Sequence, residues 1–149
     1  MYSFILATHN ILRWLVLIAA VVAIVMALIG WLGKKEWGKN DNMAGAIYVG
    51  LVDLNVLVGL ILYFLSPLTR TALTDFGAAM SNETLRFFAV EHITGMIIAL
   101  ILAHVGRVLS KRATGAPGKH RNAAIWFIMS LLAILVMIPW ERPILPGLG

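Results

Sequence analysis

The sequence contains no cysteine, and only 13% of its 149 residues are charged. The lack of cysteine excludes disulfide bonds, thiolate metal sites and iron–sulfur clusters. So little charge cannot cover the surface of a soluble domain of this length, whereas 60% of the residues are hydrophobic. Motifs of serine nucleophiles and phosphate-binding loops are also absent. The composition therefore predicts a membrane protein without nucleophilic or nucleotide chemistry.

Four long apolar stretches account for most of the chain. A hydrocarbon core about 30 Å thick needs roughly 20 helical residues, and a backbone in lipid must satisfy its own hydrogen bonds. We therefore expect an all-α, integral membrane four-helix bundle as a single transmembrane domain over residues 1–149. We expect the first stretch to be a permanent span rather than a cleavable signal peptide. The stretches are residues 4–32, 44–65, 85–109 and 123–139.

Most of the net charge of +5 lies in the connections between the stretches. Residues 33–43 and 110–122 are basic, whereas residues 66–84 are nearly neutral. Positive connections mark the cytoplasmic side, so we expect both termini on the outer, periplasmic side. Because the basic residues indicate orientation, no nucleic-acid partner is expected. His120 lies in a basic connection, where we expect it to be solvated. We expect part of residues 66–84 to lie on the membrane surface.

Ionisable residues within membrane spans are costly and are candidates for functional groups. With both termini outside, their positions along the helices divide them into two sets. His9, Arg13, Glu91 and His92 form an outer set, and Asp53, Asn55 and His104 form an inner set.

His9 and His92 are each expected on a stripe of small residues. At 100° per residue, Ala20, Ala23 and Ala27 share the face of His9, and Ala99 and Ala103 share that of His92. Small residues mark faces where membrane helices pack closely. We therefore expect both imidazoles to point into the bundle at one depth.

Two facing imidazoles can bind one haem iron from opposite sides. Gly95, near His92, would leave room for the macrocycle, and Arg13 and Arg86 could neutralise the two propionates. Glu91 could instead pair with Arg13 or orient a histidine. The alternative is that each histidine bonds a carbonyl or carboxylate and serves packing alone.

His104 lies roughly 120° around the helix from His92, so a second haem on the same face is not expected. We expect His104 to bond Asp53 as a buried polar pair. Such a pair could handle a proton or a quinone headgroup, or it could simply join two helices. Zinc is a weaker hypothesis, because the outer set offers only two histidines and one glutamate.

Several stretches of the sequence carry a resemblance to a known family. They are His9 to Trp14, Gly59 to Pro67, Arg86 to Phe88 with Glu91 and His92, Ala124 to Phe127, and Ile138 to Trp140. In these stretches, which extend over nearly the whole chain, the sequence resembles a family of small four-helix bacterial membrane proteins labelled cytochrome b-like. The resemblance implies b-type haem, with His9 and His92 as the axial ligands, although relatives often carry a histidine where this chain has Asp53.

The expected function is respiratory electron transfer in the bacterial inner (cytoplasmic) membrane, with haem b in the outer half of the bundle. The partners would be a quinone or other membrane redox subunits, within or beside a larger complex. This describes an electron carrier or accessory subunit more than a stand-alone enzyme. One alternative is a non-catalytic accessory subunit of a respiratory or photosynthetic complex. Another is a quinone-linked or proton-handling enzyme built on Asp53 and His104.

Overall fold

The computed structural model describes residues 1–141, and these fold almost entirely into helices. The elements are α1 (Tyr2–Leu32), α2 (Lys39–Leu65), α3 (Pro67–Thr74), α4 (Phe76–Met80), α5 (Glu83–Arg86), the π-helix η1 (Phe87–Glu91), α6 (His92–Arg112) and α7 (Ala116–Met137).

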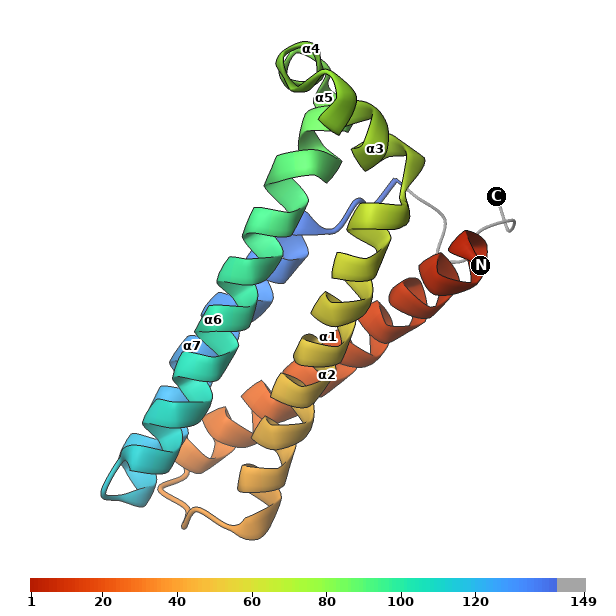
Figure 1. Cartoon of the computed structure of the whole chain (residues 1–149). Coiled ribbons are helices and arrows are strands. Elements are labelled where there is room, and N and C mark those ends of the chain that lie inside the picture. Colours follow the sequence, from red (N-terminus) through yellow and green to blue (C-terminus); the bar gives the residue numbers. More distant parts are fainter. Residues whose placement is uncertain (142–149) are drawn as a thin grey trace.

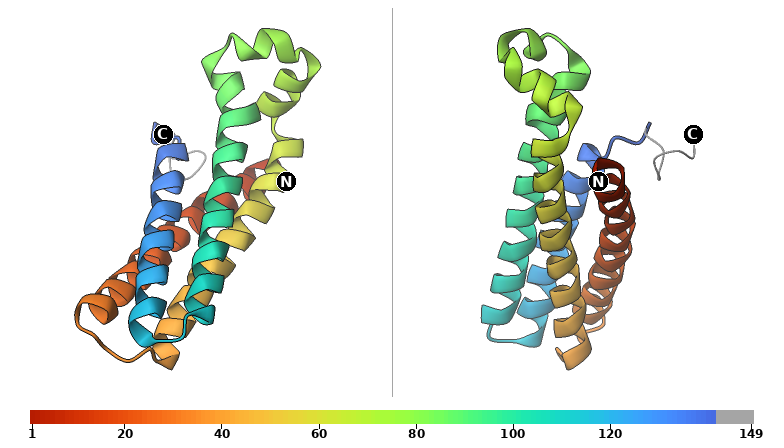
Figure 2. Two further views of the ribbon diagram at one scale, coloured as in Figure 1. Left: turned by 90° about the vertical axis from the view of Figure 1, so that its left-hand side faces the viewer. Right: turned by 45° about the vertical axis from the view of Figure 1, so that its right-hand side comes forward.

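The four long helices form a bundle in the cyclic order α1, α2, α6, α7 (Figure 1). The helices α6 and α7 pack most extensively, α1 packs against α2 and α7, and the seam between α2 and α6 is the least extensive of the four. Thus α1 and α6 occupy opposite corners. The start of α1 and the end of α7 lie toward the end of the bundle that carries α3–α5 (Figure 2). Both basic connections lie at the opposite end.

The bundle is that of a multi-pass membrane protein. Within residues 1–141, four helical segments are long and apolar enough to span a bilayer. Large apolar side chains cover their outer faces, including Ile18, Leu57, Ile101 and Leu132, each at least half exposed. Such a surface is unstable in water but matches a lipid environment. The segments are Tyr2–Leu32, Lys39–Leu65, Glu83–Arg112 and Ala116–Met137.

The core consists largely of small residues, as the stripes predicted. Lipid provides little hydrophobic drive for helix association, so close packing of backbones must supply it. The buried face of α1 contains Ala20, Ala23 and Ala27, and that of α6 contains Ala99 and Ala103. The expectation that these faces point into the bundle is confirmed.

A buried hydrogen-bond chain links three helices at the centre of this core. Ser130 on α7 donates to the carbonyl of Ala99 on α6 at 2.7 Å, and its oxygen lies 2.7 Å from the hydroxyl of Tyr48 on α2. Because Ser130 has one proton, Tyr48 must donate to it. The hydroxyl groups of Tyr48 and Ser130 and the Ala99 carbonyl are thereby all hydrogen-bonded, which burial in a low-dielectric core requires.

Two of the spanning helices begin at least five residues before their apolar stretches. The helix α2 starts at Lys39 rather than 44, with Asp41 accepting from the backbone N–H of Gly38 at 2.8 Å. The helix α7 starts at Ala116 rather than 123, because Pro117 in the first turn costs no hydrogen bond. The length of an apolar stretch therefore predicts the part of a helix that lies in lipid, but it does not predict where the helix begins.

His120 lies in the part of α7 that precedes the apolar stretch, and the expectation that it is solvated is wrong. It lies on α7, fully buried, with its ring against Trp37 at a centroid distance of 4.8 Å. A Cβ at Gly30 would lie 2.1 Å from the His120 Cε1 atom, so the ring fits only because residue 30 is glycine.

Residues 66–84 fold into short helices that cap the ends of α2 and α6. Thr69 of α3 donates to the Tyr63 carbonyl, and the Tyr63 hydroxyl donates to the Ala89 carbonyl of η1 at 3.0 Å. Ala72, Ala79 and Ala89 form a small separate core beneath these turns. The cap is therefore anchored to both helices that it connects.

The tight contact of α6 with α7 yields a stability prediction. A Cβ at Gly106 would lie 2.7 Å from the Trp126 Cβ atom and 3.0 Å from the Phe127 ring. We expect Gly106→Ala to lower the free energy of unfolding by about 1–2 kcal/mol, since overpacking exceeds the gain in helix propensity. Unfolding in detergent, followed by circular dichroism, measures the effect. Gly77→Ala in α4 is the control, because its Cβ would meet only Asp75 Oδ1, at the ordinary contact distance of 3.7 Å; equal effects of the two substitutions would contradict the packing argument.

Candidate functional site

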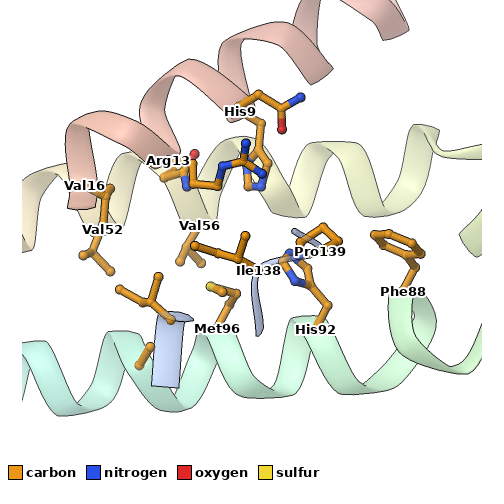
Figure 3. A pocket seen from close by; sticks show the side chains of 14 residues that line it. His9, Arg13, Val16, Val52, Val56, Phe88, His92, Met96, Ile138 and Pro139 are labelled. Atoms are coloured by element: carbon orange, nitrogen blue, oxygen red, sulfur yellow. The ribbon is translucent and has the colours of Figure 1, made fainter. Parts of the chain in front are cut away.

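His9 and His92 meet inside the bundle. They extend from α1 and α6, which occupy opposite corners, and point toward one another (Figure 3). Their ring centroids are 6.3 Å apart, and the ring planes lie at 75° to each other. The expectation that the two imidazoles face each other at one depth is confirmed.

Two adjacent cavities adjoin this histidine pair. The central cavity, about 70 Å³, lies among the four long helices. The lateral cavity, about 190 Å³, lies between α2 and α6 beneath α3. The walls of both are mostly apolar side chains. Residues common to both are His9, Asn55, Val56, Phe88, His92 and Met96.

The π-helix η1 directly precedes His92 and sets its position. The His92 backbone N–H donates to the Phe87 carbonyl, five residues earlier. The same spacing brings Arg86 next to Glu91, whose Oε1 accepts from Arg86 Nε at 2.6 Å. A π turn adds a residue to the helical turn and often occurs at functional sites. Sequence periodicity at 100° per residue does not reveal such a turn.

A backbone carbonyl orients the His92 ring. His92 Nδ1 lies 2.8 Å from the Met137 carbonyl oxygen, at the last residue of α7. Carbonyls in the last turn of a helix lack intrahelical partners, and a carbonyl can only accept. Nδ1 of His92 therefore carries the proton, and Nε2 of the neutral ring carries a lone pair. This is the arrangement of a metal-binding histidine with an outer hydrogen bond.

Three buried polar atoms beside the pair have no hydrogen-bond partner within the described residues: His9 Nδ1, Arg13 Nε and Asn55 Oδ1. Buried polar groups are rarely left unpaired, so such a cluster requires an explanation. Arg13 is only 9% exposed and lines the central cavity. Asn55 was expected in the inner set, but it lines the cavities beside His9, because α2 places it on the face toward α1.

The other predicted site residues take different positions. Arg86 pairs with the half-exposed Glu91 and does not line the cavities, so the suggested contact of Glu91 with Arg13 is not formed. A Cβ at Gly95 would lie 2.3 Å from the Met137 side chain, which occupies the space over that glycine. Sequence reasoning missed Gly59, where a Cβ would lie 3.1 Å from His9 Cε1; its signal was a glycine at the depth of His9.

Asp53 and His104 form the expected hydrogen bond, with His104 Nε2 lying 2.7 Å from Asp53 Oδ1. The expectation that the pair is buried is wrong. The side chains are 48% and 49% exposed, because the pair bridges α2 and α6 on the outer side of their seam. In a bilayer this surface faces lipid or another protein.

The histidine pair offers two protein ligands to a metal. Within residues 1–141, no three histidine, aspartate or glutamate side chains lie close enough to hold one ion together. A metal between the two imidazoles would take its further ligand atoms from outside these side chains, from a cofactor or from water. No protein-family model, curated protein or solved structure matches the chain.

The orientation of His92 is testable by nitrogen-15 NMR of labelled protein. We expect the neutral His92 ring to carry its proton on Nδ1, because it donates to the Met137 carbonyl. His104 Nε2 lies 2.7 Å from a carboxylate oxygen of Asp53, so it carries a proton whether or not Nδ1 is also protonated, and it serves as the reference signal for a protonated Nε2. Spectra of His92→Gln and His104→Gln assign the two signals. A His92 proton found on Nε2 would contradict the arrangement.

Proposed function

We propose that this protein binds haem b between His9 and His92 and carries electrons within a bacterial inner membrane. The observation that carries the proposal is the spacing of the two rings. With metal–nitrogen bonds of about 2.0 Å and ring nitrogens about 1.2 Å from the ring centre, a metal between two imidazoles separates the centroids by about 6.4 Å. The centroids here are 6.3 Å apart.

The angle of 75° between the rings is compatible with such a site. Each imidazole can rotate about its own bond to a metal, so axial ligation does not prescribe the angle between the planes. His92 presents the free lone pair of Nε2, and His9 has a buried nitrogen without a partner. Both rings therefore have a nitrogen available for ligation.

The surroundings fit a flat, largely apolar group with acidic substituents. Adjacent cavities with apolar walls border the histidine pair and would together receive its edges. Gly59 leaves space at His9, where a Cβ would lie within 3.1 Å of the ring. Arg13 has an unpartnered, buried Nε in the central cavity and can neutralise a propionate. Arg86 is less suited to this role, because Glu91 already holds it.

When bound, haem would supply reversible one-electron oxidation and reduction. The protein residues would fix its position: His9 and His92 would hold it, and the Met137 carbonyl would keep the His92 ring in register. The apolar walls would exclude water. The electron partners would be a quinone or another membrane redox subunit.

The proposed orientation places both termini outside. This orientation is supported by the position of the two basic connections, which both lie at one end of the bundle. Basic connections mark the cytoplasmic side. The connections are residues 33–38 and 113–115, with the lysines and arginines that flank them. The histidine pair lies toward the other end and so in the outer half of the membrane.

A reduced-minus-oxidised spectrum of the purified, haem-supplied protein tests the proposal. We expect the sharp α-band of low-spin, bis-histidine haem. His9→Ala and His92→Ala should each abolish it, because a single axial imidazole does not give that state. His104→Ala should leave it, since His104 lies on the outer side of the seam. Circular dichroism verifies that each variant remains helical. Folded, haem-supplied protein without the band would overturn the proposal and leave the accessory-subunit interpretation.

A matched pair of arginine substitutions tests the second contact. We expect Arg13→Gln to weaken haem binding roughly ten- to hundred-fold, the loss of one charge-assisted hydrogen bond of about 1.5–3 kcal/mol. Arg86→Gln should change the affinity much less, because Glu91 pairs with Arg86. Haem titration of the two purified variants measures the difference. Equal losses, or a larger loss with Arg86→Gln, would show that Arg13 does not contact the propionate.

A further inference from the structure

The Asp53–His104 pair lies where a bilayer does not tolerate it alone. Asp53 follows Lys39 by fourteen residues and precedes Leu65 by twelve, so it lies about 21 and 18 Å from the two ends of α2. Its side chain is 48% exposed and that of His104 is 49% exposed. A polar pair at mid-span is expensive against lipid and normally faces protein or water.

The surface of α2 beside this pair has the form of a helix-packing face. Ala46 and Gly50 are exposed and lie within about 60° of Asp53 around the helix. A Cβ at Gly50 would have no described atom within 4 Å. Small residues four apart permit close approach of membrane helices. Elsewhere in this bundle such faces are buried, whereas this one has no partner among the described residues.

We propose that a second copy of this chain covers this face, with the two α2 helices crossing near Gly50 about a two-fold axis along the membrane normal. The argument for a second copy is that the imidazole of His104 in one copy is complementary to the carboxylate of Asp53 in the other. Within the described residues, His104 Nδ1 and Asp53 Oδ2 make no hydrogen bond. A doubly protonated imidazole in one copy would donate from Nδ1 to the partner copy's carboxylate.

Symmetry makes this contact reciprocal. Copies inserted in one orientation place equivalent residues at equal depth, and a two-fold interface uses the same patch on both. Because Asp53 and His104 already share a depth through their hydrogen bond, no vertical displacement is needed. The result is a ring of two carboxylates and two imidazoles in alternation, with no net charge when both imidazoles are protonated. This inference does not rest on haem binding.

The lack of native cysteine makes the proposal testable by cross-linking. Gly50→Cys, oxidised in native membranes, should convert most of the chain to a disulfide-linked dimer, since the interface brings equivalent Cα atoms within about 7 Å. Ile18→Cys on α1 and Leu132→Cys on α7 are the controls, because they are exposed on helices outside the seam. Native mass spectrometry of the unmodified protein in lipid nanodiscs should show the dimer.

The role of the polar pair is tested in the same background. Adding Asp53→Asn to Gly50→Cys should reduce the cross-linked fraction about five-fold, as expected when hydrogen bonds between membrane helices of the two copies are lost. The proposal would be overturned if the unmodified protein were monomeric in nanodiscs and the Gly50→Cys variant formed no disulfide-linked dimer. Equal cross-linking at Ile18, which indicates random collision, or a cross-link of Gly50→Cys to a different protein would also overturn it. Asp53→Asn without effect would overturn the part assigned to the polar pair.

Discussion

Helices in lipid cannot rely on the hydrophobic effect to hold one another, and the architecture of this bundle follows from that constraint. Alanines and glycines on α1 and α6 let the backbones approach closely enough for dispersion contacts to add up. The same closeness permits the central hydrogen bonds of Tyr48, Ser130 and Ala99. The cavities at the histidine pair lie further toward the α3–α5 end of the bundle.

The seam between α2 and α6 differs from the rest of the bundle. The buried face of α2 has larger residues than that of α1, and polar bridges join this helix to the α6 side. The lateral cavity opens along the seam, and the exposed polar pair lies further along it. Both proposals therefore arise from one structural feature: a loosely packed seam leaves space for a cofactor inside and an unsatisfied polar surface outside. The bridges are Tyr63 to Ala89, Asp53 to His104, and Asn42 to Arg107.

The π turn before His92 connects the cap to the site. It brings Arg86 and Glu91 into contact and places the next residue, His92, opposite His9. The carbonyl at the end of α7 then holds the ring. Two segments, η1 and the end of α7, thus determine the orientation of the His92 imidazole. Such support from outside its own helix keeps a side chain in a single rotamer.

Apolar length, small-residue stripes and charge in the connections were sufficient to predict four spanning helices and the meeting of His9 with His92, because each depends on helix geometry alone. They could not predict where α2 and α7 begin, since caps and Pro117 act outside the lipid. Nor could they show that Glu91 pairs with Arg86, that Met137 fills the space over Gly95, or that Asp53 and His104 lie on the outside. Those outcomes depend on the rotation and tilt of each helix against its neighbours, and only the packed bundle decides these.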